Sequence, residues 1–117
     1  MRGVSKQYGA ETAVEDLTLS VRDGELLTLL GPSGCGKTTT LRLLAGLETP
    51  TAGSIAIAGE QVADPSGARP PEERSVGMVF QDFALFPHLT VRENVAFGLP
   101  DRSPAAQDER VDELLDL

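Results

Sequence analysis

Alternation of apolar and polar residues predicts several short strands. Over residues 17–21, three apolar side chains alternate with two hydroxyl side chains, a period of two that indicates a half-buried strand. After a turn at 23–24, residues 25–30 form a nearly unbroken apolar run, which is typical of a strand covered on both faces in a parallel sheet. Residues 55–58 alternate Ile with Ala, and residues 75–80 form a second apolar run. We therefore expect strands at these four places.

A glycine-rich turn and a helix follow the first apolar run. Residues 31–36 contain three glycines, and residues 37–47 place Leu41, Leu44 and Ala45 on one face of a helix. The order strand, glycine-rich turn, helix is the setting in which proteins hold phosphate groups.

The second half of the chain carries end signals of two more helices. Thr90 and Glu93 have the spacing of a capping box, so a helix should begin at Thr90 and run to about residue 97. Pro104 suits a first helical position, and the helix that it opens should still be running at the last residue. Loops rich in Pro and Gly, or short linkers, are expected at 64–71 and 101–104.

Composition narrows the class of protein. The chain has 117 residues, enough for one domain, and no apolar run approaches the roughly 20 residues of a membrane-spanning helix. Its net charge of −8, without clusters of Lys and Arg, makes nucleic acid an unfavourable partner. A single cysteine, Cys35, excludes an intrachain disulfide and lacks metal-site spacing. No secretory signal is expected at the N-terminus, so a cytosolic location fits.

The segment GPSGCGKT at residues 31–38 matches the phosphate-loop pattern G-x-x-x-x-G-K-[ST]. Its glycines let backbone N–H groups curl around phosphates, and the helix that follows points its positive end at the same anion. Lys37 would supply a charge to the β- and γ-phosphates, and Thr38 a hydroxyl to Mg²⁺. The alternative is a glycine-rich turn that joins a strand to a helix and binds no ligand. The strand and helix predicted on either side favour the phosphate site.

Three segments together resemble the ATP-binding subunits of ABC transporters, in the importer group for sugars, polyamines and ferric iron. They are VSKQYG at 4–9, the stretch from the phosphate loop to PTAG at 31–53, and VFQDFALFPHLTVRENV at 79–95. The resemblance implies that Tyr8 stacks on adenine. It also implies that Gln81, in the family's Q-loop, contacts Mg²⁺ or the attacking water. A surface tyrosine and a solvated glutamine are the alternatives.

The resemblance implies an α/β fold, a P-loop NTPase core of the ABC ATPase type with an antiparallel β arm, truncated in its helical subdomain. The whole chain, 1–117, is expected to be the N-terminal part of a nucleotide-binding domain that contains the β arm, the phosphate loop and the Q-loop. Its cofactors would be ATP and Mg²⁺. The implied nucleotide-binding residues are Tyr8, Gly31, Ser33, Gly34, Cys35, Gly36, Lys37, Thr38 and Thr39. The implied metal ligands are Thr38 and Gln81, and the implied catalytic residue is Gln81.

Three motifs of the family do not occur in this sequence: the LSGGQ signature, the second acidic motif with its catalytic Glu, and the switch His. His88 matches only a local Q-loop position and is expected to be structural. We therefore expect the chain to bind ATP without hydrolysing it efficiently. A pure nucleotide-binding module or pseudo-ATPase is the alternative. An ABC protein of DNA repair or chromosome structure is disfavoured by residues 85–90 and by the acidic charge.

The resemblance also implies partners and a location. The intact subunit would pair with a second ATP-binding subunit and dock on transmembrane permease subunits near the Q-loop region, where Phe83, Leu85 and Phe86 form an apolar cluster or, alternatively, ordinary core. It would act at the cytoplasmic face of the membrane and serve a solute-binding protein indirectly. Cys35 is either a reactive thiol that ATP protects or a small filler residue. The transported solute does not follow from this sequence.

Overall fold

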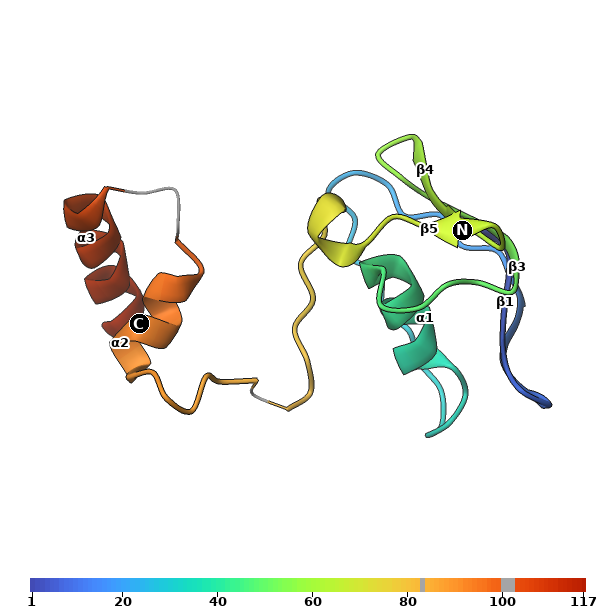
Figure 1. The fold of residues 1–117 in the computed structure, drawn as a ribbon, viewed down its shortest axis with the longest axis horizontal. Coiled ribbons are helices and arrows are strands. Elements are labelled where there is room, and N and C mark those ends of the chain that lie inside the picture. The colour runs from blue at the N-terminus through green and yellow to red at the C-terminus, as the bar shows by residue number, and fades with distance from the viewer. Residues whose placement is uncertain (83, 100–102) are drawn as a thin grey trace. The chain divides into compact units, whose positions relative to one another are not determined.

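The computed structural model describes residues 1–82, 84–99 and 103–117 and divides into two compact units. The first unit is Met1–Met78 and the second is Val79–Leu117. Figure 1 labels most of the helices and strands of both units.

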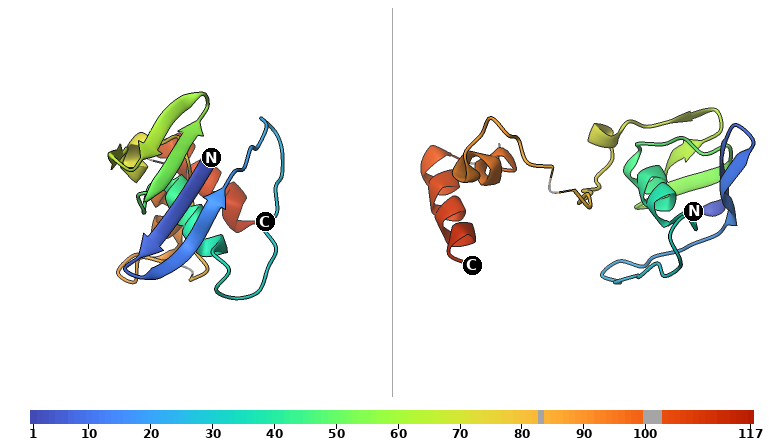
Figure 2. Two further views of the ribbon diagram at one scale, coloured as in Figure 1. Left: turned by 90° about the vertical axis from the view of Figure 1, so that its right-hand side faces the viewer. Right: turned by 90° about the horizontal axis from the view of Figure 1, so that it is seen from below.

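The first unit is built on a five-stranded antiparallel sheet with the order β2-β1-β3-β4-β5. The helix α1, Lys37–Ala45, lies against one face of this sheet, as both views of Figure 2 show. A short 3₁₀ turn, η1, covers Pro71–Glu73. The strands are β1 (Arg2–Tyr8), β2 (Glu11–Leu17), β3 (Ala52–Ile57), β4 (Glu60–Asp64) and β5 (Gly67–Ala68).

The core of this unit lies between the sheet and α1. Val4 of β1, Ile55 of β3 and Leu43 of α1 are completely buried, and Val62 of β4 joins them. The helical face predicted from the sequence is wrong in one respect, because Leu43 points inward while Leu41 is half exposed. Burial of such side chains is the main stabilising contribution available to a sheet this small.

The predicted helix at 37–47 ends two residues early. Gly46 adopts φ +86°, a left-handed conformation that glycine reaches without steric cost. The N–H groups of Gly46 and Leu47 then bond back to the carbonyls of Leu43 and Arg42, which closes the last turn.

The strand predicted at 17–21 is wrong, because β2 already ends at Leu17. The alternating residues after Leu17 make separate hydrogen bonds to the first residues of the chain. The Thr18 hydroxyl accepts a hydrogen bond from the Gly3 N–H at 3.0 Å, and the Met1 ammonium donates to the Leu19 carbonyl at 2.9 Å. The Leu19 N–H also donates to the Met1 carbonyl at 3.1 Å, but at Gly3 a side chain replaces the main-chain partner, so no regular ladder forms. Conversely, β2 itself and β4 were not predicted from the sequence. Their polar and acidic residues obscure the alternation of apolar and polar side chains that indicates a strand.

The apolar runs at 25–30 and 75–80 form no strand in the structure. Leu26 is 93% exposed and Val79 is 97% exposed. A strand needs a neighbour that takes up its backbone N–H and C=O groups, and no described residue pairs with either run. An apolar pattern indicates that the side chains favour burial, but it does not supply the second strand with which the backbone must pair.

The second unit contains α2, Val91–Phe97, and α3, Pro104–Leu115. The predicted capping box is confirmed, since the Thr90 side chain accepts from the Glu93 N–H while the Glu93 carboxylate accepts from the Thr90 N–H at 2.7 Å. Hydrogen bonds from the Thr90 backbone and hydroxyl hold the pKa of Glu93 below its usual value. The predicted start at Pro104 is also confirmed, but the helix ends at Leu115 and not at the last residue as predicted. Residues 101 and 102 of the predicted linker lie outside the described residues.

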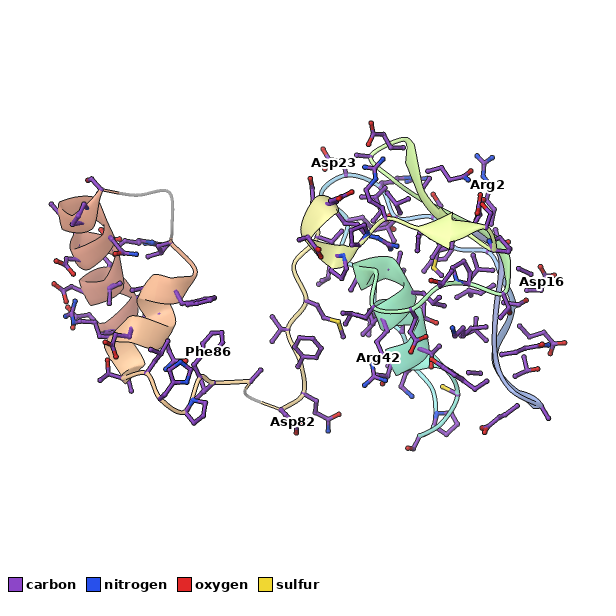
Figure 3. All side chains as sticks on the ribbon, in the orientation of Figure 1. Arg2, Asp16, Asp23, Arg42, Asp82 and Phe86 are labelled. Carbon is purple, nitrogen blue, oxygen red and sulfur yellow. The ribbon has the colours of Figure 1, made fainter. Side chains whose placement is uncertain are left out.

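The two helices of this unit are joined by buried apolar and polar contacts. Val111 of α3 is almost fully buried, and the Gln107 amide donates to the Ala96 and Leu99 carbonyls at the end of α2. The Phe86 ring, labelled in Figure 3, lies 4.4 Å from the Phe97 ring between centroids. None of the helices in the described ranges is long and apolar enough to cross a membrane.

Candidate nucleotide-binding site

The phosphate-loop segment forms an open turn that leads directly into α1. Gly36 is the N-terminal cap of the helix at φ +90°, a conformation that favours glycine. A Cβ at this position would lie only 2.4 Å from the Ala13 carbonyl oxygen of β2. Both backbone conformation and space therefore require glycine here. The first turn of α1 contains no acidic residue, so its free N–H groups present a positive end to solvent.

The Lys37 side chain folds back across the loop. Its ammonium donates to the Gly31 and Pro32 carbonyls at 2.7 Å each, and lies 3.3 Å from the Cys35 sulfur. Within the described part of the chain it forms no salt bridge with a carboxylate. A cation held only by neutral carbonyls keeps its charge available for an anion.

The hydroxyl side chains of α1 divide into a structural and an accessible set. The Thr40 hydroxyl is buried and donates to the Gly36 carbonyl at 2.9 Å, which fixes the first turn. Thr38 is exposed and Thr39 is half-buried. Ser33 and Gly34, at the tip of the loop, are also exposed. The predicted phosphate-binding residues thus lie together around one helix end and are open to a ligand.

Tyr8 lies at the end of β1 and reaches the same helix. Its phenol lies near enough to the Glu48 and Thr39 side chains for both to influence its pKa. Partial burial, followed by the contact with Glu48, raises the pKa of Tyr8 above its usual value. The structure therefore brings the predicted adenine-stacking residue beside the first turn of α1, in the same unit as the phosphate loop. Its ring remains 44% exposed.

A cavity of about 250 Å³ lies between β2 and the phosphate loop. Glu15, which no sequence motif marked, is one of the residues that line it. The lining residues are Ala13, Val14, Glu15, Leu17, Leu29, Leu30, Cys35, Gly36, Lys37 and Thr40. A second unmarked pair, Lys6 and Glu48, lies beside Tyr8 at 2.9 Å between ammonium nitrogen and carboxylate oxygen.

Gln81 belongs to the second unit, where it is exposed and lies outside regular secondary structure. Its catalytic and metal-binding roles stay predictions. Leu85 is 68% exposed and Phe86 is partly exposed, whereas Phe83 lies outside the described residues. No cluster of three or more His, Cys, Asp or Glu side chains in the described ranges could hold a metal ion.

The exposed Cys35 thiol offers a direct test of the loop. We expect a maleimide to modify it, and Mg-ATP to slow the modification, because a bound triphosphate would cover the loop. Nucleotide at ten times its Kd leaves roughly one site in ten empty, so the rate should fall roughly tenfold. Adenosine, which lacks phosphates, should give no protection. Equal rates with and without ATP would contradict the placement of phosphates over Cys35.

Comparison with known proteins supports the same family. The family model described as ABC transporter matches residues 14–117. The spermidine/putrescine import ATP-binding protein of Methylococcus capsulatus is 62% identical over 98 residues, which cover 84% of this chain and 24% of the relative. The xylose/arabinose import ATP-binding protein of Haloferax volcanii is 52% identical, with 95% and 29% covered. The Fe(3+) ions import ATP-binding protein of Rhizobium meliloti is 53% identical, with 93% and 30% covered.

A solved structure shares the fold. It is a dimeric ATP-binding cassette in a post-hydrolysis state, bound to ADP and Pi, with a TM-score of 0.78 and 30% sequence identity. The match covers 98% of this chain and 54% of that one. The chain therefore spans about a quarter to a third of the length of these curated relatives and about half of the solved cassette. With its phosphate loop and its α/β P-loop NTPase fold, the chain belongs to the ABC transporter family of ATP-binding proteins.

Proposed function

We propose that the chain is part of an ATP-binding subunit that couples ATP binding and hydrolysis to solute import, at the cytoplasmic face of the membrane. The observation that carries the proposal is the phosphate loop, in which the Lys37 ammonium has only neutral partners and lies at the positive end of α1. Several relatives carry the words "import ATP-binding protein" in their names, with polyamines, sugars or ferric ions as the imported solutes. The solute of this chain stays open.

The residues around the loop fit a magnesium triphosphate. The loop and the first turn of α1 would bind the phosphates through N–H groups and Lys37, and the exposed Thr38 hydroxyl would hold the metal. Mg²⁺, when bound, would neutralise charge on the phosphate oxygens. Gln81 would orient the water or complete the metal site, as the family resemblance implies. Isothermal titration with Mg-ATP tests the proposal, and an absence of binding would overturn it.

This chain by itself would bind ATP without efficient turnover. Its 117 residues contain neither the signature motif nor the second acidic motif, so no side chain is identified that activates the water. A phosphate-release assay beside the titration separates the two functions. Binding without release supports this proposal, and sustained release would show that other residues of the chain suffice. The alternative function, a nucleotide-binding module that never hydrolyses, predicts the same absence in the full-length protein.

Permease subunits and a second ATP-binding subunit would be the partners, with a solute-binding protein acting indirectly. Leu85 and Phe97 are exposed, and the Phe97 ring lies beside Phe86, which gives the second unit an apolar surface of the kind that partners cover. One structural relative is described as dimeric, which supports a dimer here. Nucleic acid is not proposed as a partner, because the net charge is −8.

We expect Tyr8→Ala to weaken ATP binding and to spare tripolyphosphate. Stacking of a base on an aromatic ring contributes about 1–3 kcal/mol, or roughly 5- to 150-fold in Kd, whereas tripolyphosphate has no base to lose. Competitive titration of both ligands in Mg²⁺ measures the difference. An equal loss for the two ligands would rule out stacking as the role of Tyr8.

A further inference from the structure

We propose that Lys6 and Glu48 form a positioning pair that holds the Tyr8 ring ready to receive a purine base. The proposal rests on the proposed ATP-binding function and adds to it two residues that no motif marks. In this arrangement Glu48 anchors the edge of the ring, Lys6 lies over one face, and the rest of the ring stays free for the base.

The pair connects two separate parts of the first unit. Lys6 and Tyr8 are two residues apart in β1, so their side chains leave the same face of the strand. Glu48 comes from the segment that follows α1. The Lys6 ammonium lies 2.9 Å from the Glu48 carboxylate and donates to the Thr49 carbonyl at 2.8 Å. The two side chains are only 13% and 22% exposed, which is more enclosed than the other salt bridges of the described residues.

The pair lies directly against Tyr8. The Lys6 ammonium lies over the ring at 4.9 Å from its centroid, which is a cation–π geometry. Glu48, which binds this ammonium at 2.9 Å, and Thr39 lie near enough to the phenol to influence its pKa. The hydrogen bond from Lys6 is the largest cause that lowers the pKa of Glu48, so this carboxylate stays ionised and remains an acceptor. The cation thus covers part of the ring, while 44% of the residue stays exposed.

Fixing the ring matters because an unrestrained tyrosine must lose rotamer freedom when a base stacks on it. A side chain ordered before binding avoids most of that entropy cost, so the same contact yields more affinity. The position of the ring relative to the phosphate loop also favours nucleotide binding. The contact with Thr39 places the ring beside the turn that begins with the phosphate-binding Lys37, so base and phosphates would bind within one short stretch of surface.

A purely structural role for the pair predicts something different. If Lys6 and Glu48 only tie β1 to the end of α1, their loss should lower stability and weaken all ligands equally. A positioning role instead changes the ratio between the Kd values of Mg-tripolyphosphate and Mg-ATP, which isolates the contribution of the base.

The first experiment measures this ratio by isothermal titration for the 117-residue chain and its variants Glu48→Gln, Tyr8→Phe and the double variant. Each single change should lower the ratio by about two- to fivefold, the range expected for a contact of a partly exposed charged group. The double variant should lose little more than either single one, because both changes weaken the same interaction between the phenol and the side chain at position 48. Glu60→Gln is the matched control, since Glu60 pairs with Arg69 at the same 2.9 Å in β4 but touches no aromatic ring.

The second experiment titrates Tyr8 itself by its near-ultraviolet tyrosinate absorbance. The chain has one Tyr and no Trp, so this signal reports on Tyr8 alone. Glu48→Gln should lower the pKa of Tyr8, because the carboxylate raises it, and Lys6→Met should raise the pKa further, because the ammonium lowers it. Opposite shifts from the two halves of one salt bridge are not expected from a general loosening of the fold.

The possible results of the titrations overturn different parts of the proposal. An unchanged ratio in Glu48→Gln and Tyr8→Phe, with ATP still preferred over tripolyphosphate by the parent chain, would overturn the positioning pair alone. Equal affinity of the parent chain for the two ligands would overturn base stacking, and the pair with it, while leaving the phosphate site intact. Binding of neither ligand would instead overturn the proposed ATP-binding function.

Discussion

Lys37→Ala should reduce the affinity for Mg-ATP by roughly 30-fold or more, because truncating one partner of a hydrogen-bonded charge pair costs about 2–5 kcal/mol. The structure gives this change a clear origin. The ammonium donates to two loop carbonyls and has no carboxylate partner among the described residues. Its positive charge is therefore not neutralised by another side chain and would be fully available to ATP. Isothermal titration gives the Kd directly.

Stability should hardly change in this variant. The Gly31 and Pro32 carbonyls that Lys37 releases are exposed and can bond to water instead. Arg42→Gln is the matched control, because it removes one positive charge from the last turn of the same helix and leaves the loop untouched. Figure 3 labels Arg42 on α1. A loss in Lys37→Ala no larger than that in Arg42→Gln would show that Lys37 contributes only to the overall charge.

Residues that touch a ligand were easier to recognise from the sequence than residues that support them. The phosphate loop can be recognised from the sequence because its glycines, lysine and threonine must lie at fixed spacings to surround an anion. Glycine at position 36 is required by its conformation and by the nearby Ala13 carbonyl, and both requirements act within this local turn and its neighbour. Lys6 and Glu48 have no such spacing, because 41 intervening residues must fold before their side chains meet.

Helix starts were predicted well, whereas strands were not. A capping box such as Thr90 with Glu93 is complete within four residues, so the sequence contains all of its hydrogen-bonding partners. A strand depends on a neighbour elsewhere in the chain. The apolar runs at 25–30 and 75–80 have no such neighbour among the described residues, while polar β2 forms a strand because β1 pairs with it. An apolar run therefore does not predict a strand unless the chain also supplies the strand that pairs with it.

Arg74 is the clearest supporting residue that the sequence concealed. Only 5% of it is exposed, and its guanidinium donates to four backbone carbonyls. They are those of Leu43, Leu44, Val62 and Arg69, at 2.8–3.4 Å. Two belong to the last turn of α1, where free carbonyls favour a cation. Burial lowers the pKa of Arg74 from its usual value, and no acidic side chain in the described ranges pairs with it.

We expect Arg74→Met to lower the free energy of unfolding by about 2–4 kcal/mol, because it leaves several buried carbonyl groups without a donor. Arg74→Lys should lose most of the same amount, since one ammonium cannot reach carbonyls on three sides. The control is Arg69→Met, which breaks only an exposed salt bridge and should cost less than about 1 kcal/mol. Urea unfolding followed by circular dichroism measures all three, and a change below 0.5 kcal/mol in Arg74→Met would contradict the prediction.

Binding of ATP separates this defect from a defect of the site. Arg74 acts at the far end of α1 from the phosphate loop, so folded molecules of Arg74→Met should keep their intrinsic affinity for Mg-ATP. Nucleotide at 100 times its Kd then adds about 2.7 kcal/mol to the free energy of unfolding, which offsets most of the loss. Lys37→Ala should show the reverse, with near-normal stability and little gain from the same ATP concentration. Arg74 thus supports the helix that carries the proposed phosphate site, and Lys37 would supply the charge that this site uses.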